Sequence, residues 1–163
     1  MAEVEKLGVD PKIVKEAAAI LIPRGAVKNV YYAHVQPIYG TAEEESDADV
    51  IGAYFPDHHL VNPAAVSSYK IRDMGFYLGI VERCDDLVYK RFRGLVMAGV
   101  GQEAEHAFRR GIGVYEIADG TITRVHSVPS YLSREETVAL FEKLGLRRDN
   151  GWKPEPVCNM RRV

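Results

Sequence analysis

The stretch GIGVYEIADGTITRVHSV, residues 111–128, contains the clearest structural signal in this sequence. Two runs rich in β-branched residues flank Asp119-Gly120, and a two-residue Asp-Gly loop favours a type I′ turn between antiparallel strands. The turn fixes three facing pairs on one side of the sheet: Ile117 with Ile122, Tyr115 with Arg124, and Gly113 with His126. The sequence therefore predicts a β-hairpin in which His126 shares a face with isoleucines.

Helices are predicted before and after this hairpin. Asp10-Pro11 supplies a capping side chain and a proline at the first helical position, and apolar residues follow at helical spacing. Ser133 and Glu136 form a capping box, and Gly145 ends the helix that the box begins. A third helix is expected from a cap at Ser67 or Ser68 and from apolar residues at steps of three and four: Ile71, Met74, Leu78 and Val81.

The remaining segments are less distinct. Residues 87–100 alternate apolar and polar side chains, which predicts a half-buried strand. Residues 26–38 are rich in β-branched and aromatic residues, yet their apolar spacing also suits a helix, so both structures stay open. Five carboxylates within residues 43–49 indicate a solvated loop or a helix N-terminus rather than a metal site.

Length and composition favour one compact domain. The chain has 163 residues, of which 47% are hydrophobic and 27% charged, and these values are typical of globular proteins. We expect a single domain over residues 1–146 and a C-terminal tail over residues 147–163. With 21 Lys and Arg against 23 Asp and Glu, no net positive field favours nucleic acid, although basic residues interleave with aromatic ones at 89–93.

The cysteine content and the apolar runs bear on localisation. Cys84 and Cys158 are far apart and form no Cys-x-x-Cys pair, so neither a disulfide framework nor a zinc site is expected. The first eight residues lack the layout of a signal peptide, and no apolar run approaches the ~20 residues that cross a bilayer. We expect a soluble, cytoplasmic protein without a membrane partner.

Motifs for common cofactors are missing from the sequence. It contains no P-loop, no nucleophile elbow and no dinucleotide-binding glycine pattern. The triplet 57–59, Asp-His-His, is found in two-metal phosphoesterases, but the further Asp-x-Asp segment that such a site needs is missing. We therefore expect neither a metal nor another cofactor.

His126 is the leading candidate for acid–base chemistry, because imidazole titrates near neutral pH. Its predicted partner Gly113 has no side chain, which would leave space beside the ring. Two interpretations stay open: a pocket residue, or a core histidine with one hydrogen-bond partner. Tyr31 could add a phenol to a cavity and Asp73 a carboxylate, provided that the fold brings them together.

Three segments resemble the nuclear-transport-factor-2-like superfamily, in its SnoaL-like polyketide-cyclase and ketosteroid-isomerase branch. They are YFPDHHLVNP at 54–63, the hairpin at 111–122, and VALFEKLGL at 138–146. The resemblance implies an α+β fold in which a curved antiparallel sheet packs on helices as a cone with an internal pocket. It also implies a homodimer. Where members of the family place a carboxylate on the last strand, this chain has His126.

The function implied by this resemblance is a cofactor-free lyase, isomerase or cyclase. It would bind a small carbonyl or ring compound and act by proton transfer, with His126 as acid or base and His59, Tyr31 or Asp73 as helpers. The alternative is a non-catalytic binding or regulatory module that meets a protein partner through its pocket or sheet face.

Overall fold

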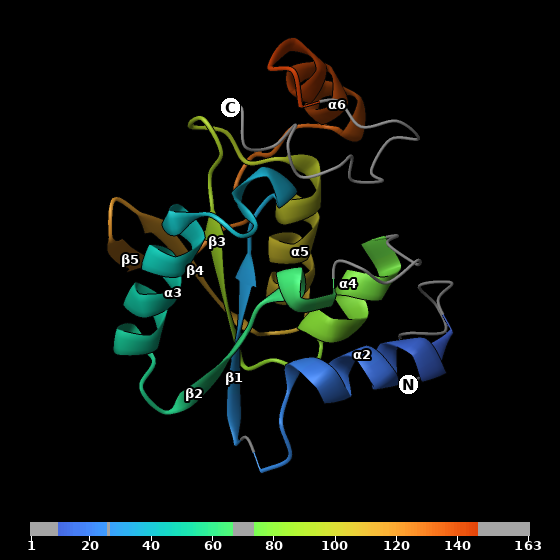
Figure 1. The fold of residues 1–163 in the computed structure, drawn as a ribbon, viewed down its shortest axis with the longest axis vertical. Helices are drawn as coiled ribbons and strands as arrows, with labels where there is room; N and C mark the ends of the chain where they lie inside the picture. The colour runs from blue at the N-terminus through green and yellow to red at the C-terminus, as the bar shows by residue number, and fades with distance from the viewer. Residues whose placement is uncertain (1–9, 26, 67–73, 147–163) are drawn as a thin grey trace.

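The fold is built on one five-stranded sheet with the strand order β2-β1-β3-β4-β5 (Figure 1). The computed structural model describes residues 10–25, 27–66 and 74–146. Its strands are β1 (Lys28–Ala33), β2 (His58–Val61), β3 (Asp86–Lys90), β4 (Gly113–Ala118) and β5 (Thr121–Arg124). The pairs β1–β2, β1–β3 and β3–β4 are parallel, and β4–β5 is antiparallel.

Helices cover both faces of the sheet. The helix α3 (Ala42–Tyr54) lies on one face, while α2 (Pro11–Leu21), α4 (Met74–Val81) and α5 (Ala98–Arg109) lie on the other (Figure 1). The helix α6 (Arg134–Lys143) and two short 3₁₀ turns, η1 (Gln36–Ile38) and η2 (Pro63–Val66), complete the elements. Two apolar cores result, one beneath each helical layer.

The predicted α+β class is confirmed, since helices pack on a mixed five-stranded sheet. The antiparallel cone implied by the resemblance is wrong, because three of the four strand pairings are parallel. The reason lies in β1, within the segment left open between strand and helix. Five of its six residues are buried, and a strand buried on both faces is typical of a parallel sheet between two helical layers.

The hairpin is confirmed in its turn and in two of its three facing pairs. Ile117 pairs with Ile122, and Tyr115 with Arg124. The predicted pairing of Gly113 with His126 is wrong, because β5 ends at Arg124 and His126 is exposed in the segment that follows. Gly113 instead pairs with Asp86 of β3, whose Oδ1 atom would lie 2.4 Å from a Cβ at position 113. The space expected beside His126 is therefore not formed there.

The strand predicted over 87–100 is correct only as far as Lys90. A turn with positive φ at Arg93 and Gly94 follows, and Ala98 begins α5. The acidic run 43–49 lies in α3, with three glutamates in the first turn after the N-cap Thr41, so the helix N-terminus was the correct alternative. The cap at Ser67 or Ser68 and the tail 147–163 lie outside the described residues. No described helix has the length and apolar character needed to cross a bilayer.

Helix α5 packs so closely that one glycine cannot gain a side chain. A Cβ at Gly101 would lie 2.0 Å from Cγ of Tyr131, whereas a Cβ at Gly99 would meet only Met74 Sδ at 3.8 Å. We expect Gly101→Ala to lower the free energy of unfolding by about 2 kcal/mol through overpacking. Gly99→Ala should raise it by about 0.5 kcal/mol, because alanine is the better helix former. Urea denaturation of both variants checks the pair, and equal effects would contradict it.

Candidate functional site

The sheet has a topological switch point beside β1. The chain passes from β1 through α3 to β2 on one side of β1, and then through α4 to β3 on its other side. The segments after β1 and β3 therefore leave the carboxyl ends of these strands toward opposite faces. Open α/β sheets bind their ligands at such a point, so the carboxyl ends of β1 and β3 are where a functional site is expected.

A buried tyrosine–glutamate pair lies on the α5 side of β1. Tyr31, on β1, donates a hydrogen bond from its hydroxyl to Oε2 of Glu103, on α5. Tyr31 is fully buried, and Glu103 exposes 6% of its surface. Glu103 is held there because α5 turns one face toward the sheet, and this face also carries the buried residues Val100, Ala104 and Ala107.

The surroundings of Glu103 change its acidity. Burial raises the pKa of the Glu103 carboxyl to about 8, and the hydrogen bond from Tyr31 opposes that rise. Burial, and then the neighbouring Glu103, raise the pKa of Tyr31 well above its ordinary value, so the phenol stays a hydrogen-bond donor. A carboxyl group that titrates near neutral pH can both give and accept a proton there.

Only one of the two carboxyl oxygens of Glu103 has a protein partner. Tyr31 holds Oε2, and within the described ranges Oε1 forms no hydrogen bond and no Lys, Arg or His forms an ion pair with Glu103. Buried carboxyl groups are normally paired or fully hydrogen-bonded, and strongly perturbed ones concentrate at functional sites.

A second polar cluster lies on the α3 side of the same two strands. Asp47, on α3, accepts hydrogen bonds from the Tyr32 hydroxyl at 2.5 Å and from Lys90 Nζ at 2.7 Å. Lys90, the last residue of β3, also lies 3.1 Å from Oε1 of Glu43. Asp47 is 6% exposed, so Tyr32 and Lys90 supply the partners that its buried charge requires.

His34 joins the end of β1 to α3. Its Nδ1 lies 2.9 Å from the carbonyl oxygen of Tyr32, and its Nε2 lies 2.5 Å from Oε2 of Glu44. The carbonyl oxygen can only accept, and the Glu44 carboxyl group faces the other ring nitrogen. Burial raises the pKa of Glu44, but hydrogen bonds from His34 and from the Gly40 N–H outweigh it and lower that pKa overall. This cluster fixes the segment that follows β1.

The structure does not bring together the three predicted site residues that it describes. Tyr31 is buried against Glu103. His59 lies near the amino end of the sheet, facing Asn29, and its Nε2 is 2.6 Å from the carbonyl oxygen of Leu21. His126 is exposed after β5, and Asp73 lies outside the described residues. Catalytic roles for these residues stay predictions.

Sequence reasoning missed Glu103, Asp47 and Lys90 as site residues. Glu103 had a recognisable signal: positions 100, 103, 104 and 107 share one face of a helix, and Glu103 is the charged residue among valine and alanine. That helix was not predicted because glycine, at 99 and 101, is a poor helix former. The alternation of apolar and polar residues over 87–100 favoured a strand instead. Asp47 and Lys90 are brought together only by the parallel pairing of β1 with β3.

No family model, curated protein or solved structure matches this chain. Among the described residues, no group of three or more His, Cys, Asp or Glu side chains is placed to hold a metal ion. The buried polar groups on the two faces of β1 and β3 are therefore what bears on function.

Proposed function

We propose that this protein is an enzyme that moves a proton on a small carbonyl or ring compound, with Glu103 as its acid–base group. One observation carries the proposal: Glu103 exposes 6% of its surface and, among the described residues, has no cationic partner and accepts a hydrogen bond at Oε2 from the Tyr31 hydroxyl.

The chemistry follows from the pKa of about 8. Near neutral pH, Glu103 is present in both its protonated and its ionised form. The ionised form can accept a proton from carbon next to a carbonyl group, and the protonated form can return it to another atom. Tyr31 acts as a positioning residue, because its hydroxyl holds Oε2 of the Glu103 carboxyl group.

A hydrogen–deuterium exchange assay with a panel of compounds tests the proposal across the whole substrate class. The protein is incubated in D₂O with small ketones, keto acids and cyclic enones, and deuterium uptake next to the carbonyl group is followed by NMR. We expect uptake with at least one compound, and a loss of about 10²- to 10⁴-fold in Glu103→Gln. Glu105→Gln, on the same helix, is the matched control and should retain the rate.

Two results would contradict the proposal. One is exchange by Glu103→Gln at the rate of the unchanged protein. The other is no exchange with any compound of the panel, which would favour the alternative of a non-catalytic binding module in which Tyr31 and Glu103 form a structural pair.

The role of Tyr31 has its own test. Tyr31→Phe removes the hydrogen bond that lowers the pKa of Glu103, so that pKa should rise above about 8. The ¹³C chemical shift of the Glu103 carboxyl, followed against pH, measures the change directly. The pH dependence of exchange should move upward by the same amount. An unchanged titration would show that Tyr31 does not control the acidity of Glu103.

A further inference from the structure

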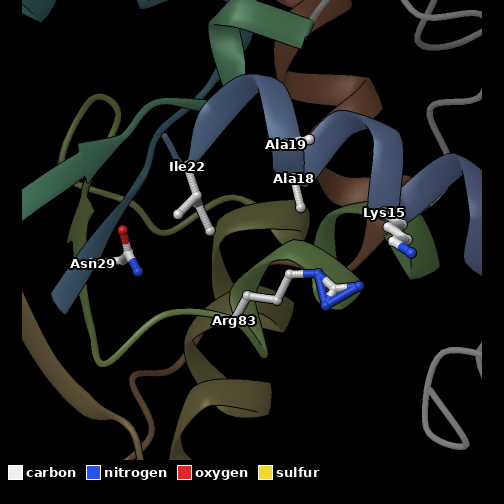
Figure 2. Close-up of a pocket in the computed structure, with 6 residues that line it drawn as sticks. All are labelled: Lys15, Ala18, Ala19, Ile22, Asn29 and Arg83. Carbon is white, nitrogen blue, oxygen red and sulfur yellow. The ribbon is translucent and has the colours of Figure 1, made fainter. Parts of the chain in front are cut away.

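A groove opens at the amino end of β1, away from the carboxyl edge of the sheet. It has a volume of about 590 Å³ and lies between α2, the start of β1 and the turn after α4 (Figure 2). Six residues line it: Lys15, Ala18, Ala19, Ile22, Asn29 and Arg83. Its walls are mainly apolar, and cationic side chains reach it from α2 and from the turn after α4.

Two polar atoms of this lining lack a partner. In the described part of the chain, three buried side-chain nitrogen or oxygen atoms have no hydrogen bond, and Asn29 Oδ1 and Arg83 Nε are two of them. Asn29 exposes only 7% of its surface. Buried polar atoms are almost always hydrogen-bonded, so an exception calls for an explanation such as strain, a functional role, or a water or ion that binds there. Both exceptions at one groove indicate a binding site.

The two atoms without hydrogen-bond partners indicate which groups a ligand of this groove must carry. Arg83 Nε–H is a donor and requires an acceptor, and Lys15 adds a second positive charge, so an anionic oxygen fits there. Asn29 Oδ1 is an acceptor and requires an O–H or N–H group. The nearby Asp85 carboxylate, which accepts a hydrogen bond from the Asn29 backbone N–H at 2.8 Å, disfavours a doubly charged ligand such as a phosphate monoester.

We propose that this groove binds a small carboxylic acid that carries a hydroxyl or N–H group on an apolar body. The carboxylate accepts from Arg83 and pairs with Lys15, the hydroxyl or N–H group donates to Asn29 Oδ1, and the apolar body lies against Ala18 and Ile22. The site does not depend on Glu103.

Three probes that differ by one group each test the proposal. They are 4-hydroxyphenylacetate, phenylacetate, which lacks the hydroxyl, and 2-(4-hydroxyphenyl)ethanol, which lacks the charge. Binding is followed through the NMR signals of the Asn29 side-chain amide and the Arg83 Nε–H. We expect a Kd of about 1 mM for the first probe, as its size allows. Phenylacetate should bind about fivefold and the alcohol at least about tenfold more weakly.

Variants locate the binding. Arg83→Met should weaken the binding of 4-hydroxyphenylacetate by about tenfold or more. Lys15→Ala should weaken the binding of this probe less. Lys12 is an exposed lysine of the same helix and lies outside the groove, so Lys12→Ala should leave the affinity unchanged. Lys15 is exposed, so Lys15→Ala should fold and keeps the test decisive even if Arg83→Met does not fold. Absence of saturable shifts at both Asn29 and Arg83, equal affinity for the three probes, or equal effects of the two lysine variants would each overturn the proposal.

Discussion

Replacing Glu103 with glutamine makes the protein more stable at alkaline pH and removes most of its loss of stability between pH 5 and pH 8. In the unfolded chain this carboxyl group ionises near pH 4.5, whereas in the folded protein it keeps its proton up to about pH 8. Between these values the unfolded state releases a proton that the folded state retains, so rising pH favours unfolding. The free energy of unfolding should therefore fall by about 5 kcal/mol across this interval.

The measurement is urea denaturation at pH 5, 7 and 9. Below pH 4.5 both states hold the proton, and above pH 8 both have lost it, so the contribution is constant outside the interval. Glu103→Gln has no ionisable group at this position, and its stability should change far less with pH. Glu105→Gln loses the ion pair with the exposed Arg109 but keeps an oxygen that can accept from the Tyr131 hydroxyl, so it should follow the unchanged protein. Parallel pH dependences for the protein and Glu103→Gln would show that Glu103 is ionised when folded.

Replacing Lys90 with methionine should lower the free energy of unfolding by about 3 kcal/mol. Lys90 neutralises Asp47, whose side chain is 9% exposed and also accepts a hydrogen bond from Tyr32. Without Lys90 this carboxyl group lies in a buried position with no lysine beside it, and removal of one partner of a buried pair is strongly destabilising.

A double variant separates lost charge compensation from lost packing. Asp47→Asn combined with Lys90→Met removes both charges, so it should recover a large part of the stability that Lys90→Met alone loses. Lys28→Met, at an exposed position of β1, should have little effect. Additive losses from the two changes would mean that Lys90 contributes through its methylene chain rather than through its charge.

Local features of the fold were predictable because their signals lie within a few residues. The Asp119-Gly120 turn, the Asp10 cap and the capping box of Ser133 with Glu136 all form as expected. Strand direction was not predictable in this way. A central strand buried on both faces, such as β1, lacks the alternation that identifies a strand with one solvated face, and its partners lie far away in the sequence.

In the candidate site, too, single residues could be predicted but their partners from distant parts of the sequence could not. Tyr31 was predicted as a possible phenol in a cavity, but its partner Glu103 is 72 positions later and meets it only because α5 crosses the same face of the sheet. His126 was favoured because the hairpin register was extended two residues beyond the end of β5. Register holds only while the ladder of hydrogen bonds continues, and that ladder ends shortly after Arg124, with the bond from Val125 N–H to the Val114 carbonyl oxygen.

Residues near the end of the described chain form hydrogen bonds with the start of α5 and the residues just before it. The backbone N–H of Ala98, at the start of α5, donates to the Thr137 hydroxyl at 3.0 Å, and Leu132 N–H donates to the carbonyl oxygen of Val96 at 2.9 Å. Leu146 is buried in the same core. During synthesis, α5 therefore lacks these partners until about 40 further residues have left the ribosome, because domains complete their core only when all of its segments have emerged. A nascent chain that pauses before residue 132 therefore leaves the start of α5 without these two hydrogen bonds, and the core without Leu146.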